Sequence, residues 1–169
     1  ETCYDSEVLY SSSKGKTEVQ ADQKSTLDYH LTVREILDFA STVDYKDIEF
    51  ILESRTLNLA LAQEGMSGNY GLKVGYAINL EDNREVFGGD FLCYAMSLTA
   101  AASDARMAGC TLAAMSNSGS GNQGITVTMP VIAYSIKYGN SDEQLARALT
   151  LSHLIAIHIK GYLGKLSAL

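Results

Sequence analysis

The sequence predicts a mainly α-helical domain with a short antiparallel β-hairpin near its start, an α+β fold overall. Three observations support this prediction. Apolar residues recur at helical spacing along most of the chain, only one proline occurs among 169 residues, and two short β-prone runs flank a glycine near the start. This length suits a single domain with its own core, so residues 1–169 are treated as one domain.

The hairpin is expected within residues 1–29. The runs "SEVLYSSS" and "KTEVQAD" lie on either side of Lys14-Gly15-Lys16, where the glycine would form the turn. Residues 30–169 are expected to form the helical part. Its first segment, "LTVREILDFAST", places its apolar residues close to helical spacing.

A second helix is expected to open near Asp44 and to continue through "KDIEFILESRTLNLALAQ". It should end in "EGMSGNYGLKVGY", where repeated glycines argue against a helix. The next helix, residues 90–108, is rich in alanine and other small residues. Small residues let neighbouring helices approach closely, so we expect this helix to be central.

Two helices are expected in the last third of the chain. The stretch "ITVTMPVIAYSIKYG" alternates at first like a strand, but Pro130 would lose a ladder bond in a central strand. We therefore favour a helix that starts in the preceding loop. Asn140 and Ser141 precede the final helix as capping residues, and Asp142 and Glu143 in its first turn suit the helix dipole.

Composition excludes several classes of protein. A net charge of −7 without a basic stripe argues against a nucleic-acid partner. The most apolar segment, residues 143–163, is interrupted by arginine, lysine and histidine, which argues against a membrane span. Three cysteines at no disulfide-framework spacing, and a start without a signal-peptide pattern, favour the cytoplasm. The sequence opens without methionine, and "GYLGKLSAL" stops inside an apolar helical pattern without a capping residue or polar tail. We therefore expect a piece of a longer protein.

The polar loop in "MSNSGSGNQGITVTMPVI" is the main candidate site. Its spacing Gly119-x-Gly121-x-x-Gly124 matches a dinucleotide fingerprint, but that motif needs a preceding strand and "CTLAAM" is a poor one. A Walker loop is excluded because no Lys-Ser/Thr pair follows the glycines.

A tight turn between helices would explain the glycines of this loop, but not its five serine and amide side chains together. A helix that begins just after such a loop offers free amides and a positive dipole end to an anion. We therefore favour a site for a carboxylate-sized anion. Its candidate substrate-binding residues are Ser116, Asn117, Ser118, Gly119, Ser120, Gly121, Asn122, Gln123 and Gly124.

His153 and Lys160 lie seven residues apart in the final helix and so share one face. One interpretation is a core histidine whose hydrogen bonds are made within the protein, beside a lysine whose charged end reaches solvent. The other is that this face borders a site, where a buried lysine with a lowered pKa could act as a base. His158 lies about 140° around the helix from His153, so the two histidines cannot bind one metal on one face.

The cysteines are poorly spaced for a shared metal. If Cys93 and Cys110 bracket one helix, they lie about 25 Å apart, too far for one metal or cluster. Cys93 is expected to be a packing residue. Cys110, close to the polar loop, remains a candidate metal ligand without firm support.

Several blocks of the sequence resemble one known family. They are "LTVREI", "LALAQEGMSGNYGLKVGY", "ASDARMAG", "MSNSGSGNQGITVTMPVI" and "ALTLSHLIAIHIKGYLGKLSAL". Together these blocks, from about residue 30 to residue 169, are similar to the serine dehydratase-like alpha-chain family. The closer likeness is to its bacterial branch that is related to archaeal L-cysteine desulfidase.

This resemblance implies a lyase that uses a four-iron, four-sulfur (4Fe-4S) cluster and no pyridoxal phosphate. Three thiolates would hold the cluster and leave one iron open as a Lewis acid. The implied reaction is α,β-elimination from L-cysteine or L-serine, giving pyruvate, ammonia, and sulfide or water. The loop would then hold the substrate carboxylate, and Lys160 and His153 become the catalytic candidates for proton transfer or orientation.

The sequence also departs from the family pattern. The branch carries a Cys-Thr-Glu-Pro motif early in the chain and a Cys-Gly-Cys motif just after a stretch like "GKLSAL", and both are missing here. The ligand cysteine that serine dehydratases carry in the block "GSGNQG" is missing too. We therefore expect the cluster in the intact parent, with its ligands outside these residues, and no activity from this piece alone.

The expected partner is a small amino-acid substrate, with neither nucleic acid nor membrane, and a homo-oligomer is compatible with the sequence. A second hypothesis is a non-catalytic helical module that binds a small anion or carboxylate. A third is a purely structural helical domain in which the glycine-rich loop is only a turn.

Overall fold

The computed structural model describes residues 31–84 and 90–163. Residues Leu31–Leu169 belong to one compact unit. Its elements in chain order are α1 (Val33–Thr42), α2 (Tyr45–Ile48), a 3₁₀ turn (Glu49–Leu52), α3 (Glu53–Ser67), α4 (Val74–Asn79), α5 (Glu81–Arg84), α6 (Asp90–Met107), α7 (Gly121–Tyr138) and α8 (Asp142–Leu163).

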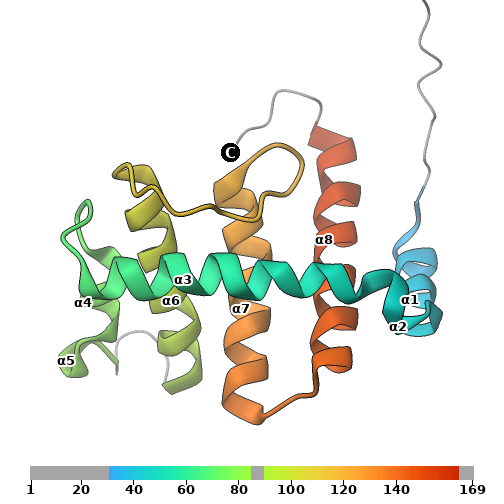
Figure 1. The fold of residues 1–169 in the computed structure, drawn as a ribbon, viewed down its shortest axis with the longest axis horizontal. Coiled ribbons are helices and arrows are strands. Elements are labelled where there is room, and N and C mark those ends of the chain that lie inside the picture. Colours follow the sequence, from blue (N-terminus) through green and yellow to red (C-terminus); the bar gives the residue numbers. More distant parts are fainter. Residues whose placement is uncertain (1–30, 85–89, 164–169) are drawn as a thin grey trace, which may run out of the picture. The chain divides into compact units, whose positions relative to one another are not determined.

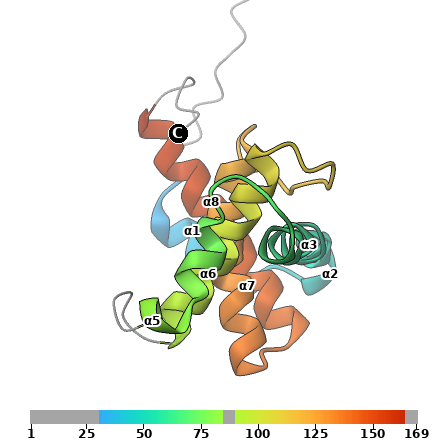
Figure 2. The same cartoon turned by 90° about the vertical axis from the view of Figure 1, so that its left-hand side faces the viewer.

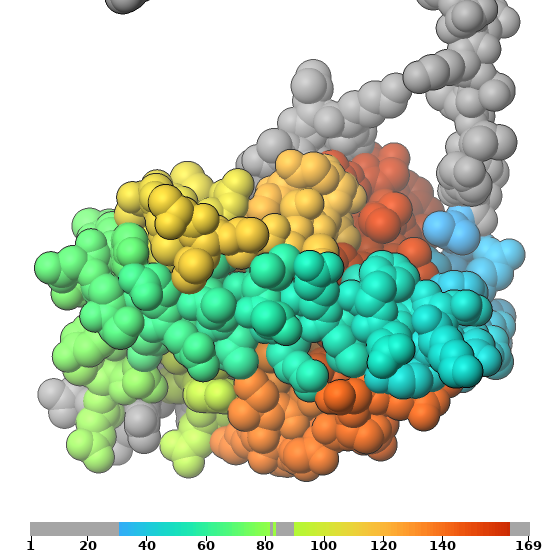
Figure 3. Space-filling model, in the orientation of Figure 1, coloured from blue at the N-terminus to red at the C-terminus, as the bar shows by residue number. Residues whose placement is uncertain are grey.

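The helices form two layers. Helices α6, α7 and α8 stand side by side in one layer, and α3 runs across them (Figure 1). A view along α3 shows that this helix lies on one side of the row (Figure 2). In the space-filling view α3 forms a band across the front face, with the α6–α7 connection above it (Figure 3). Helix α4 packs on α6, and α1 packs on α8.

The core lies where α3, α6, α7 and α8 meet, and small residues allow the close packing there. Ala101 of α6 is fully buried. A Cβ atom added at Gly65 of α3 would overlap the Ala101 carbonyl, and one added at Gly75 of α4 would overlap the backbone of Ala101 and Ser97. The prediction of a central, small-residue helix at 90–108 is confirmed. The glycine-rich stretch nevertheless contains the start of α4, because Gly75 lets that helix pack against α6.

Helices α1, α2 and α8 each begin where the sequence supplies a side-chain cap. Thr32 and Glu35 form a capping box at the start of α1, in which the Thr32 N–H donates to Glu35 Oε2 at 2.8 Å. Asp44 caps α2 as predicted. The predicted continuous helix after Asp44 is instead interrupted by the 3₁₀ turn before α3 begins. Ser141 caps α8 as predicted, since its Oγ accepts from the Gln144 N–H at 3.2 Å.

Helix α7 contains Pro130, and this confirms the choice of helix over strand for that stretch. Proline cannot donate to the carbonyl four residues earlier, which interrupts the ladder of α7 at this point. Ser152 of α8 donates to the adjacent Val127 carbonyl at 2.6 Å and so joins α8 to α7 beside the interruption.

The predicted α+β class is wrong. Residues 31–84 and 90–163 are mainly helical and contain no strand, and their β-type pairing is one isolated bridge between Asn117 and Ser120. The physical reason is that their apolar residues recur at helical spacing, so each segment satisfies its own backbone and buries one face against other helices. The hairpin expected in residues 1–29 lies outside the described residues.

No helix in the described part of the chain has the length and apolar character needed to cross a membrane.

Candidate functional site

The polar loop closes on itself in a two-residue turn. The Asn117 N–H donates to the Ser120 carbonyl at 3.0 Å, and the Ser120 N–H donates to the Asn117 carbonyl at 2.9 Å. Between them Ser118 and Gly119 have φ values of +49° and +81°. Two successive positive φ angles are typical of a type I′ turn, which favours small or amide residues. The local sequence therefore fixes the shape of the loop.

Helix α7 begins directly after this turn. Ser120 is its N-cap, and the Ser120 Oγ accepts from the Gln123 N–H at 3.2 Å. The Ser120 carbonyl accepts from the Gly124 N–H at 3.0 Å. The N–H groups of Gly121 and Asn122 are left without an intrahelical acceptor, as at any helix start. They form the positive end of an 18-residue helix.

One glycine of the loop is required by a close contact with backbone. A Cβ at Gly124 would overlap the Met115 carbonyl oxygen, whereas a Cβ at Gly121 would meet only the end of the flexible Arg106 side chain. The last glycine of the spacing that resembles a dinucleotide fingerprint thus has a packing cause here. The segment before the turn passes directly against the first turn of α7.

Asn58 of α3 holds the segment before the turn in place by a hydrogen bond. This residue is fully buried. Its Oδ1 accepts from the Met115 N–H at 2.9 Å, and its Nδ2 donates to Thr128 Oγ1 of α7 at 2.7 Å. One amide group thereby joins α3, the loop entry and α7.

Asn117 connects the loop to α8. Its Nδ2 lies 2.9 Å from His153 Nδ1 and donates to the His153 carbonyl at 3.2 Å. Its Oδ1 accepts from Ser118 Oγ at 3.0 Å and from Gln123 Nε2 at 3.1 Å. Asn117 and His153 are both buried. Burial lowers the pKa of His153 below its ordinary value.

Lys160 reaches the same loop from one face of α8. Its Nζ donates to the Ser118 carbonyl at 2.8 Å and lies 3.5 Å from Gln123 Oε1. The side chain is partly exposed rather than buried. The structure thus brings His153 and Lys160 of α8 together with Asn117, Ser118 and Gln123 of the loop.

A second cation lies at the loop, and sequence reasoning missed it. Arg106, at the end of α6, donates to Asn122 Oδ1 at 3.0 Å, and its guanidinium lies against Gly121. Asn122 Nδ2 in turn lies 3.1 Å from Met107 Sδ. The block "ASDARMAG" contained this arginine, but spacing within one segment does not show which distant segment it meets. Arg106 and Lys160 therefore contact the loop from different helices.

Other predicted residues lie apart from this cluster. Ser116 is exposed, and its backbone passes beside Gly124. His158 packs edge-on against Tyr162, with ring centroids 5.2 Å apart. Cys110 lies beside Tyr70. The hydrogen bond to Glu64 and then the nearby Cys110 thiol raise the pKa of Tyr70 to about 12.

The described residues do not fit a 4Fe-4S cluster. Within residues 31–84 and 90–163 no three histidine, cysteine, aspartate or glutamate side chains are grouped so that they could hold a metal ion. Cys93 is buried in the core, as expected for a packing residue, and Cys110 is partly exposed. We therefore assign no chemical step to a cluster in this part of the chain.

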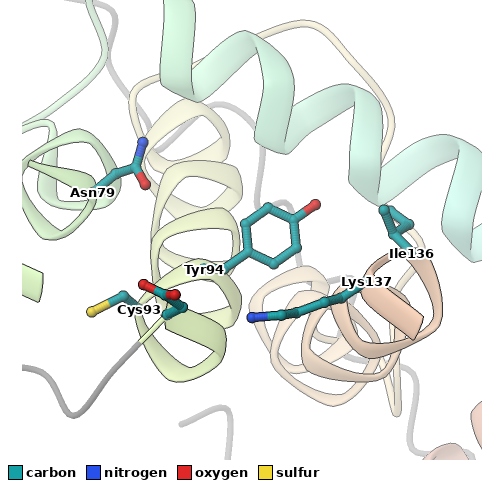
Figure 4. A pocket seen from close by; sticks show the side chains of 6 residues that line it. Asn79, Cys93, Tyr94, Ile136 and Lys137 are labelled. Atoms are coloured by element: carbon teal, nitrogen blue, oxygen red, sulfur yellow. The ribbon is translucent and has the colours of Figure 1, made fainter.

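A cavity of about 310 Å³ lies elsewhere, between the ends of α4, α6 and α7. It is lined by Asn79, Asp90, Cys93, Tyr94, Ile136 and Lys137, and Lys137 extends from α7 toward α6 (Figure 4). Lys137 is 15 residues from Asn122 along α7, which corresponds to about 22 Å. The cavity is therefore not part of the loop site.

Fold and geometry together define a helical domain with a candidate anion-binding loop at the start of a long helix. The family model described as "Serine dehydratase alpha chain" matches residues 7–169. The chain belongs to this family, and the resemblance seen in its sequence blocks is confirmed.

Its relatives carry names without an assigned activity. A "UPF0597 protein" of Oleidesulfovibrio alaskensis is 55% identical over 139 residues, covering 82% of this chain and 32% of the relative. "UPF0597 protein YhaM" of Escherichia coli O127:H6 is 48% identical over 162 residues, covering 96% of this chain and 37% of the relative. The chain thus spans about a third of the length of these relatives. No solved structure matches the chain.

Proposed function

We propose that the full-length protein is an amino-acid lyase that performs α,β-elimination on L-cysteine or L-serine, and that this chain supplies the carboxylate-binding part of its site. The observation that carries the proposal is the loop itself. Two free amides at the start of α7 lie beside Arg106, and Lys160 and His153 meet the same loop from α8. Family membership supports the same reaction class.

Binding of the carboxylate follows from elementary electrostatics. The first-turn amides of Gly121 and Asn122 point positive partial charge out of the helix start. Arg106 and Lys160 add two formal positive charges in a chain whose net charge is −7. A carboxylate there gains charge-assisted hydrogen bonds, which are about twice as strong as neutral ones.

The elimination also needs a group that accepts the α-proton. Loss of that proton and of the β-substituent gives an aminoacrylate, and hydrolysis of its imine form gives pyruvate and ammonia. Lys160 is this chain's candidate acceptor for that proton. Its ammonium form adds charge to the carboxylate site, so it must first release its own proton to water when its bonds to Ser118 and Gln123 are exchanged for contacts with substrate. In the full-length protein a 4Fe-4S cluster, held by cysteines outside the described residues, would activate the leaving group.

The test uses the full-length protein, reconstituted with iron and sulfide without oxygen. Pyruvate is measured from L-cysteine and from L-serine in parallel samples with and without reconstitution. We expect pyruvate only after reconstitution, and the faster substrate identifies the natural class. Lys160→Arg, which keeps the charge but removes the proton acceptor, should lose turnover while it still binds L-alanine, a substrate analogue without a leaving group. No pyruvate from either substrate would refute the lyase.

A non-catalytic anion-binding module is the second candidate, and one observation favours it. The amide side chains of Asn117, Asn122 and Gln123 already have partners within the protein, so these three amides need no substrate to hold them in place. This candidate predicts saturable binding of L-alanine without pyruvate from either amino acid.

A further inference from the structure

The orientation of the Asn117 amide is fixed by its neighbours. Its nitrogen faces the His153 carbonyl, which can only accept a hydrogen bond, at 3.2 Å. Its oxygen faces the amide nitrogen of Gln123 at 3.1 Å. Exchanging the two Asn117 atoms would place oxygen against oxygen and nitrogen against nitrogen. Only the observed orientation satisfies both contacts.

This orientation determines the protonation state of His153. Asn117 Nδ2 carries only hydrogens, so His153 Nδ1, 2.9 Å away, must accept and must carry no proton. A neutral imidazole with an unprotonated Nδ1 carries its proton on Nε2. The doubly protonated form would place an N–H against an N–H. Burial lowers the pKa of His153 in the same direction, and no charged neighbour contributes to that shift.

The remaining ring nitrogen is the unusual atom. His153 Nε2 is buried and has no hydrogen-bond partner among the described residues, although the residue is only 9% exposed. A buried donor without a partner destabilises the folded protein, so such atoms in native proteins call for a partner. A protonated Nε2 can donate but cannot accept a proton, so its partner must be an acceptor.

We infer that Asn117 holds His153 as a neutral Nε2–H donor for an anionic oxygen of the ligand, and that His153 is therefore not the base. Asn117 is the positioning residue and His153 the binding residue. The assignment of the tautomer stands on the hydrogen bonds alone. The assignment of the ligand oxygen to an amino-acid carboxylate rests on the proposed function.

The tautomer is read directly from ¹⁵N spectra of the full-length protein labelled at histidine, with His153 identified by the signal lost in His153→Gln. We expect a protonated Nε2 and an unprotonated Nδ1 at about pH 7. Asn117→Asp supplies only acceptors and should move the proton to Nδ1. If that variant does not fold, the wild-type spectrum still decides. A wild-type Nδ1–H form, or an imidazolium, would overturn the inference.

The ligand is tested by adding L-alanine to the same sample. Donation from Nε2–H predicts a saturable shift of the His153 Nε2 signal, while the His158 signals on the same helix stay in place. An unchanged Nε2 signal would overturn the ligand assignment. Both readouts are independent of turnover, so the expected spectra together with absent pyruvate would refute the lyase and leave the His153 assignment standing.

Discussion

Asn58 shows how one residue can position a site that it does not line. It accepts from the Met115 N–H and donates to the Thr128 hydroxyl from a fully buried position. Asn58→Ala leaves the Met115 N–H without this partner, whereas the Thr128 hydroxyl still donates to the Gly124 carbonyl at 2.8 Å. An unsatisfied buried group costs about 1–3 kcal/mol, so we expect the free energy of unfolding, measured in urea, to fall by about that amount. Asn69→Ala, at an exposed position, is the control. Equal losses in both variants would contradict the anchoring role.

His153 makes stability depend on pH in a defined direction. Its pKa is lowered by burial from 6.5, so below about pH 6.5 the unfolded chain binds a proton that the folded chain resists. The free energy of unfolding should therefore fall as pH decreases from 6.5 toward the folded-state pKa. His153→Gln removes this contribution, and urea titrations on both sides of that window should show a smaller loss than wild type. If the free energy of unfolding changes equally with pH in wild type and in His153→Gln, burial of His153 is not the cause of the pH dependence.

At this scale the sequence predicted the loop and the shared face of His153 and Lys160, because both depend on local spacing. It did not predict Arg106 or Asn58 as site residues. The partner of Arg106 lies 16 residues away in the sequence, and the two partners of Asn58 lie 57 and 70 residues away. Periodicity within one segment does not encode which distant segment packs beside it. Their side chains become informative only once α3, α6 and α7 are placed together.

Among the elements, α1 depends on a single arginine of α8. The Arg147 guanidinium donates to the carbonyls of Ala40, Ser41 and Val43 at the end of α1, at 3.0–3.1 Å. These carbonyls have few intrahelical partners, and the negative end of the helix favours a cation. Arg147→Met should lower the free energy of unfolding by about 1–3 kcal/mol and accelerate hydrogen exchange in α1.

The control for this change is Arg55→Met. Arg147 forms an ion pair with Glu143 at 2.7 Å, and Arg55 forms one with Asp142 at the same distance, with both of its side chains partly or largely exposed. Such pairs contribute about 0–1 kcal/mol. If both variants lose the same free energy of unfolding, and the amide hydrogens of α1 exchange at the wild-type rate in Arg147→Met, then Arg147 does not stabilise α1.

The start of α7 has its own test. Gly124→Ala places a methyl group on the Met115 carbonyl, so either the loop or α7 must shift. We expect a loss of about 1–3 kcal/mol in the free energy of unfolding and weaker L-alanine binding. Gly161→Ala in α8 meets no atom within 4 Å and should be neutral or stabilising by about 0.5–1 kcal/mol. Unchanged stability in Gly124→Ala would show that the close contact is not required.

Helix positions were largely predictable because caps and apolar spacing are local signals. Asp44, Ser141 and the helix through Pro130 follow the sequence. The 3₁₀ turn before α3 and the helix α4 did not, because both depend on packing that the sequence does not display. The α+β class was wrong because residues 31–84 and 90–163 are helical without a strand. The hairpin on which that class rested lies in residues 1–29, outside the described residues.

For the whole molecule, the proposed anion site lies in an acidic chain. The net charge of −7 repels anions at long range, so binding must come from short contacts at the loop. Sequence reasoning gave the family and the loop. It gave no ligands for the proposed cluster, and within residues 31–84 and 90–163 no three histidine, cysteine, aspartate or glutamate side chains are grouped to hold a metal ion.

The most direct measurement is pyruvate formation by the reconstituted full-length protein, compared with its Gly124→Ala and Gly161→Ala variants. We predict that wild type and Gly161→Ala form pyruvate from L-cysteine or L-serine at similar rates. Gly124→Ala, with its loop displaced, should be slower by about tenfold or more in kcat/KM, equivalent to about 1.4 kcal/mol. Equal rates in all three proteins would show that the loop does not hold the substrate, and no pyruvate from wild type would refute the lyase itself.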